Sequence, residues 1–124
     1  MMQDQQEISR PSWPEALELL TKEHEGDEVT IEVVNQEFGD LVEAEKIPLT
    51  YLQYDHKDDA VIVAVGGRSG RYPVVLRHII AHPTAIRRVR PRSPSGAHAI
   101  AIAGPDGDET LVTLHHQVAP EGGA

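Results

Sequence analysis

The chain has 124 residues and a formal net charge of −9, with 40% hydrophobic and 25% charged residues. This length suits one domain with a single core, and the composition excludes a wholly disordered chain. Cysteine is absent, which excludes disulfides, thiolate metal sites and cysteine nucleophiles and fits a reducing compartment. We expect neither a secretory signal nor a bilayer-spanning stretch, and therefore a cytoplasmic protein with no membrane partner.

The first predicted element is a helix. Ser12–Glu15 fits a capping box with proline in the first turn, which indicates a helix start. Apolar residues at helical spacing follow in Ala16–Leu20, and the pattern ends near His24, with Gly26 available as a stop. Trp13 is the only tryptophan, and we expect it to anchor the core.

After Gly26 the pattern changes from helical spacing to the alternation typical of half-buried strands. Pro48 either separates two strands or bends the chain at a sheet edge, and the apolar run Val74–Ile80 also admits a short helix. The turn Gly104–Gly107 joins the last two strands in a hairpin. The predicted strands are Val29–Val33, Leu41–Ile47, Leu49–Tyr54, Ala60–Val65, Val74–Ile80, Thr84–Arg90, Ala97–Ala103 and Thr110–His116.

These elements predict the fold class. Parallel strands need long crossover connections, and the chain offers no second long helix after the first. We therefore expect a mainly β protein, a small rolled or barrel-like antiparallel sheet with one N-terminal α-helix. Residues 1–11 are predicted to be a flexible N-terminal segment, 12–118 a single β-rich domain, and 119–124 a disordered tail.

The order of these motifs resembles an uncharacterised family of small bacterial proteins, a domain of unknown function. The resemblance covers Trp13 to about Leu114 and implies a compact bacterial protein to which no site residues can be carried over. The segments that carry it are Trp13–Gly26, Val29–Val33, Val42–Leu49, Asp55–Asp58 and His78–Thr84.

A weaker likeness is to the Sm-like barrels, in which a helix precedes five bent strands. Tyr51–Asp55 leading into Ala60–Ile62 is similar to the strand-turn-strand of those RNA-binding proteins. The strands expected after Ile80 do not fit that pattern, and likeness of fold alone implies no function.

Charge is distributed unevenly along the chain. Residues 1–59, 60–105 and 106–124 carry −12, +7 and −4, and the middle block has no acidic residue. Either the acidic and basic segments face each other within the fold or across a dimer, or the arginines form an anion-binding or partner surface. The candidates for that surface are Arg68, Arg71, Arg87, Arg88, Arg90 and Arg92, with Arg77 in the same block.

Histidines and acids suggest a third kind of site. His78 and His82 stand at i, i+4 and are candidate metal ligands, together with one residue of the pair His115-His116. The turn Asp55–Asp59 combines carboxylates with an imidazole, although a polar turn needs such residues in any case. No nucleophile, phosphate-binding or dinucleotide signature is present, so no catalytic residue, metal or cofactor is assigned.

We therefore predict a non-enzymatic protein-interaction or structural module, with a second copy or an acidic protein as partner. One alternative is a small nucleic-acid-binding barrel that uses the same arginines. It is disfavoured because the chain is acidic overall and poor in aromatic residues for base stacking. The other alternative is a metal-binding protein or enzyme that uses His78 and His82.

Overall fold

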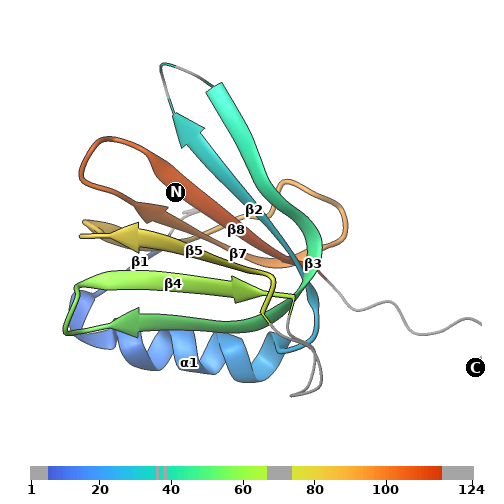
Figure 1. Ribbon diagram of the computed structural model, residues 1–124, viewed down its shortest axis with the longest axis horizontal. Helices are drawn as coiled ribbons and strands as arrows, with labels where there is room; N and C mark the ends of the chain where they lie inside the picture. Colours follow the sequence, from blue (N-terminus) through green and yellow to red (C-terminus); the bar gives the residue numbers. More distant parts are fainter. Residues whose placement is uncertain (1–5, 36, 38, 67–73, 116–124) are drawn as a thin grey trace, which may run out of the picture.

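The computed structural model describes residues 6–35, 37, 39–66 and 74–115. Eight antiparallel strands form one sheet in the order β1-β6-β7-β8-β2-β3-β4-β5, together with one α-helix (Figure 1). Within these residues β1 and β5 are the two edges, so the sheet is rolled but not closed. The predicted fold class is confirmed. The elements are β1 Gln6–Ile8, the 3₁₀ turn η1 Arg10–Ser12, α1 Trp13–His24, β2 Glu28–Asn35, β3 Gly39–Asp55, β4 Ala60–Val65, β5 Leu76–Ala81, β6 Ala85–Val89, β7 Gly96–Ala103 and β8 Glu109–His115.

The helix α1 has the predicted limits but not the predicted cap. Ser12 is the N-cap residue and Pro14 lies in the first turn, yet no side-chain capping hydrogen bond forms. Instead, the hydroxyl of Ser12 accepts a hydrogen bond from that of Ser9, at 3.1 Å. The helix ends at His24, and Gly26 then adopts a φ of +89°, a conformation that glycine reaches without steric cost.

Strand β3 produces the roll of the sheet, because its two halves pair with different strands. Its first half pairs with β2 and its second half with β4, and the register shifts on both sides of the change. Lys46 lies near this point with a φ of +53°, and Pro48 follows. The sequence left open whether Pro48 separates two strands or bends one; the structure shows one bent strand (Figure 1).

The helix packs against the second half of β3, which pairs with β4 and no longer with β2. The amide of Leu52 donates to the hydroxyl of Thr21 at 2.8 Å, and that hydroxyl lies 3.1 Å from the carbonyl of Leu52. The amide of Leu49 also donates to the carbonyl of Asp27, and the amide of Gly26 to that of Leu49. Backbone groups that a sheet edge would expose are thereby satisfied, which fixes α1 along β3 (Figure 1).

One core lies between the helix and the two parts of the rolled sheet. Trp13 is 2% exposed, which confirms its predicted place in the core, and Leu17 of the same helix is fully buried. Aliphatic residues on alternate positions of the strands complete the core, as period-two burial predicts. They include Val29, Ile31, Val61, Val63, Ile86, Ile100, Ile102, Val112 and Leu114.

One segment differs from the sequence-based expectation, and one alternative that the sequence left open is decided in favour of the predicted strand. Within the predicted flexible segment 1–11, Gln6–Ile8 forms β1 and pairs with β6. The run that also admitted a helix is strand β5. Residues 116–124, which include the predicted tail, lie outside the described residues. No helix in the described part of the chain is long and apolar enough to cross a membrane.

Candidate functional site

A groove lined by arginines lies on the outer face of β6, β7, β8 and β2. Alternation along β6 turns Ile86 into the core and Arg87 to the outer face. The groove has a volume of about 220 Å³ and a floor that includes small or buried apolar side chains. Its lining is Val34, Arg87, Val89, Arg90, Arg92, Ala101, Glu109 and Leu111, and we call it the arginine groove.

The segment after β6 folds back over the outer face and brings Arg92 to the groove. Gly96 permits this close approach, since a Cβ there would lie 2.5 Å from the Cβ of Pro91 and 3.1 Å from Cγ2 of Thr113. The groove is therefore formed by β6 together with the turn at residues 90–95, which lies beside β7 and β8.

Acidic segments supply partners for Arg87 and Arg92. Arg87 forms an ion pair with Glu109 of β8, and Arg92 lies 3.6 Å from the carboxylate of Asp40. Acidic and basic segments thus meet within the fold, one of the two arrangements that the charge pattern allowed. The side chains of Arg92 and Asp40 are 69% and 44% exposed, so water screens their attraction and either group can exchange partners at little cost.

Two other described arginines of the basic block, Arg88 and Arg77, lie away from this groove. Arg88 faces the opposite way from Arg87 and lines a separate hollow with β1 and α1. Arg77, on β5, donates to the hydroxyl of Tyr51 at 3.2 Å. Arg68 and Arg71 lie outside the described residues. Of the six predicted surface residues, the structure brings together Arg87, Arg90 and Arg92.

A buried histidine lies beside the groove, under the same turn. His115 is 3% exposed; its Nδ1 is 2.7 Å from the hydroxyl of Ser95, and its Nε2 is 2.8 Å from the hydroxyl of Thr30. Burial, followed by the charge of Lys46, lowers the pKa of His115 below its ordinary value. A neutral imidazole held by two hydroxyls ties the turn to the sheet. Because no described carboxylate bonds to this imidazole, the arrangement lacks the orienting acid of a catalytic triad.

His78 and His82, the predicted metal pair, have different partners. Nε2 of His78 is 3.4 Å from the hydroxyl of Thr110, and burial lowers the pKa of His78. Nδ1 of His82 is 3.3 Å from the carboxylate of Asp59. Among the described residues, neither histidine belongs to a group of three ligands with metal-binding spacing.

The polar turn at 55–59 has roles in the local structure. Asp55 accepts hydrogen bonds from the amides of Lys57 and Asp58, at 3.0 and 3.4 Å, as an Asx turn does. The hydroxyl of Tyr54 donates to Asp59 at 2.6 Å, and this hydrogen bond lowers the pKa of Asp59 and raises that of Tyr54. These hydrogen bonds therefore stabilise the turn that connects β3 and β4 in a hairpin.

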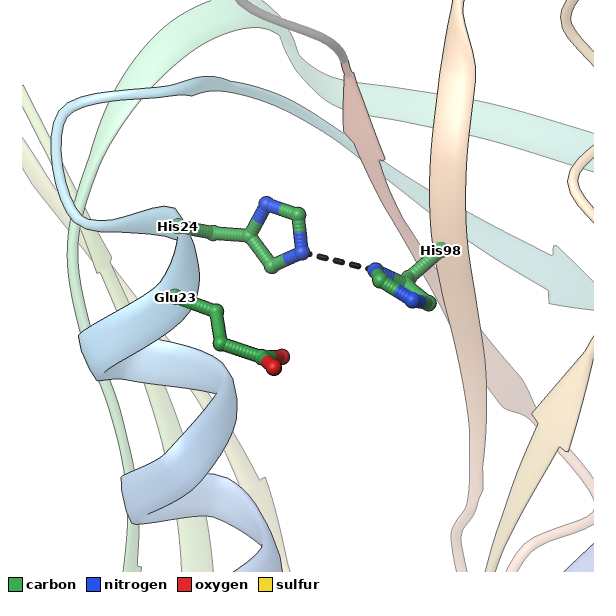
Figure 2. A group of neighbouring side chains, drawn as sticks. All are labelled: Glu23, His24 and His98. Carbon is green, nitrogen blue, oxygen red and sulfur yellow. Dashed lines mark hydrogen bonds between the residues drawn. The ribbon is translucent and has the colours of Figure 1, made fainter.

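A second histidine pair joins the end of α1 to β7. Nε2 of His24 lies 2.7 Å from Nδ1 of His98, and Glu23 extends toward the space beside them (Figure 2). His24 is 6% exposed, whereas Glu23 and His98 are exposed. Sequence reasoning missed this group, because 74 residues separate its two histidines and no spacing signal connects them.

The fold and these sites define a class: a small, open, rolled β domain with an N-terminal helix and a basic groove on its outer face. The chain belongs to a family of unknown function, DUF5335, whose model matches residues 4–121. It is similar to an "Uncharacterized protein" of Aquifex aeolicus (strain VF5), with 35% identity over 79 residues. That match covers 64% of this chain and 65% of the relative. No solved structure matches the chain, and the likeness to Sm-like barrels is not confirmed.

Proposed function

We propose that this protein is a non-enzymatic interaction module of the bacterial cytoplasm, which holds an acidic segment of a partner protein in the arginine groove. The observation that carries the proposal is that Arg87, Arg90 and Arg92 line one groove with an apolar floor. Three guanidinium groups and one carboxylate, from Glu109, give the lining a formal charge of +2 in a chain of net charge −9. Such a local reversal of charge favours a carboxylate-rich ligand.

The size and lining of the groove favour a protein segment over a small molecule or a nucleic acid. Its volume of about 220 Å³ is below the range of roughly 300–1,000 Å³ that is usual for small-molecule sites. It suits one or two side chains of a larger partner. None of its lining residues is aromatic, so bases would have no stacking platform there.

The existing ion pairs do not block this role. The exposed pair of Arg92 and Asp40 contributes only about 0–1 kcal/mol. The pair of Arg87 and Glu109 is more buried, with side chains 25% and 36% exposed. Exchange of Asp40 for a partner's carboxylate replaces one guanidinium–carboxylate pair with another, so it costs little in itself. Net affinity then comes from a carboxylate that contacts two guanidinium groups at once and from cover of the apolar floor.

Binding of a fluorescein-labelled peptide, in which glutamates flank leucines, tests the proposal. By fluorescence anisotropy we expect saturable binding that weakens when salt rises from about 0.05 M to about 0.5 M. Arg90→Ala and Arg92→Ala each weaken it roughly tenfold, the equivalent of about 1.4 kcal/mol. Arg88→Ala is the matched control, because it removes the same charge from a different hollow and leaves affinity unchanged.

Two outcomes contradict the proposal. Equal losses for Arg88→Ala and Arg90→Ala would mean that only overall charge matters and that the groove has no special role. Tighter binding of a labelled single-stranded oligonucleotide than of the peptide would favour the nucleic-acid alternative. Sedimentation identifies the source of the acidic segment: a dimer that Arg90→Ala dissociates makes the partner a second copy.

A further inference from the structure

We propose that Glu23, His24 and His98 form a binding site for one Zn²⁺ ion. Their ligand atoms, one from each residue, all lie within 4.8 Å of one another. They come from the last turn of α1 and from β7, and His24 and His98 direct ring nitrogens toward each other (Figure 2). This site is separate from the arginine groove, and its existence does not depend on the proposed function.

The orientation of His24 is the second observation that supports a metal. Its Nδ1 lies 3.0 Å from the carboxylate of Asp27, and the side chains of His24 and Asp27 are only 8% and 15% exposed. A carboxylate accepts a hydrogen bond but does not donate one, so Nδ1 of His24 carries a proton, and in the Nδ1–H tautomer of the ring Nε2 is the atom that offers a lone pair to a metal. A carboxylate behind a ligating histidine is the arrangement that orients imidazole ligands in zinc sites.

The distances fit a site that opens slightly to admit the ion. Two nitrogens bound tetrahedrally to Zn²⁺ at about 2.0–2.1 Å lie about 3.3 Å apart. The nitrogens of His24 and His98 are 2.7 Å apart, so they must move apart by roughly 0.6 Å when the ion binds. His98 and Glu23 are exposed and can make this adjustment, while buried His24 remains fixed by Asp27.

Binding of the ion requires one proton to move on the ring of His98. With His24 in its Nδ1–H tautomer, Nδ1 of His98 is the donor in the hydrogen bond between the two rings and Nε2 of His24 is the acceptor. Zn²⁺ requires a lone pair on Nδ1 of His98, so the proton of this exposed ring moves by exchange with water to Nε2. Each imidazole then binds the ion through one lone pair, Glu23 supplies a carboxylate oxygen, and a water molecule takes the fourth position.

The ligand set selects the class of ion. Two imidazoles and one carboxylate suit Zn²⁺ and related transition ions. Mg²⁺ and Ca²⁺ prefer sites made of oxygen atoms, so we expect neither to compete at millimolar concentration.

Zinc titration of the full chain, freed of metal with a chelator and followed by competition with a chromogenic zinc indicator, tests the site. We expect one Zn²⁺ per chain and a rise in the melting temperature. His98→Ala abolishes saturable binding. Asp27→Asn, which leaves all three ligands in place, weakens it by roughly 10–100-fold.

The control is His82→Ala, which removes a different histidine that contacts a carboxylate, and it leaves zinc affinity unchanged. Circular dichroism verifies that each variant is folded; since His98 and Glu23 are exposed, Glu23→Gln is the second variant if His98→Ala does not fold. No saturable binding at micromolar Zn²⁺ would overturn the proposal. Binding that His98→Ala and Glu23→Gln both leave intact would also overturn it.

Discussion

Replacement of Trp13 by phenylalanine tests how the N-terminal segment is attached to the core. The indole N–H donates to the carbonyl of Ile8 at 3.0 Å, and the ring packs edge-on against Tyr54 at 5.3 Å. The guanidinium of Arg10 lies 4.3 Å from the indole centroid. One side chain thus joins β1, η1, α1 and β3.

The expected loss can be summed from these contacts. The hydrogen bond contributes about 1 kcal/mol, the cation–π contact of partly exposed Arg10 about 0.5 kcal/mol, and the volume lost on going to phenyl about 1 kcal/mol. Trp13→Phe should therefore lower the free energy of unfolding by about 2.5 kcal/mol, and Trp13→Ala by about 3–5 kcal/mol. Because no tryptophan remains in either variant, urea unfolding is followed by far-ultraviolet circular dichroism.

The matched control is Leu19→Ala on the same helix, where the side chain is 53% exposed and the loss should stay within about 0.5 kcal/mol. Hydrogen exchange of the amides of Gln6–Ile8 gives a second readout, with faster exchange expected in Trp13→Phe. A loss below about 0.5 kcal/mol for Trp13→Phe, with β1 unchanged, would refute the view that Trp13 attaches this segment.

Two further predictions concern the turn over the outer face and its histidine. Gly96→Ala places a Cβ against Pro91, so it should lower the free energy of unfolding in urea by about 1–3 kcal/mol. It should also weaken binding of the acidic peptide. Unchanged stability and affinity would show that the turn is not packed as described. His78 and His115 have lowered pKa values, so the unfolded chain binds protons more tightly than the folded one; the free energy of unfolding should therefore fall as pH drops below about 6.5. His115→Gln should reduce that slope, and a slope as steep as that of the original chain would contradict the assignment.

The sequence predicted the elements whose patterns are local. Alternation identified β2, β7 and β8, and a continuous apolar run identified β4. The limits of α1 followed from its cap residues and Gly26. Strand β1 was missed because it is only three residues long with a single buried side chain, and it exists through pairing with β6, about 80 residues away. The course of β3 stayed open because its bend is determined by which strand each half pairs with.

The candidate sites were predictable only in part. The density of arginines was visible in the sequence, but alternation along β6 places Arg87 and Arg88 on opposite faces, so one surface for all candidates was not to be expected. The predicted pair His78 and His82 takes unrelated partners, since His82 lies beyond the end of β5. His24 and His98 meet because the last residue of α1 comes close to the start of β7, which no local pattern reveals.

The central claim is that the outer face of β6, β7 and β8 binds acidic protein segments. Amide resonances of the isotope-labelled chain, recorded during titration with the acidic peptide, test it most directly. We predict shifts concentrated at Arg87, Ala101 and Leu111, with the amides of α1 unmoved. Shifts centred on α1 or the hollow beside Arg88, or no shifts at saturating peptide, would contradict the account.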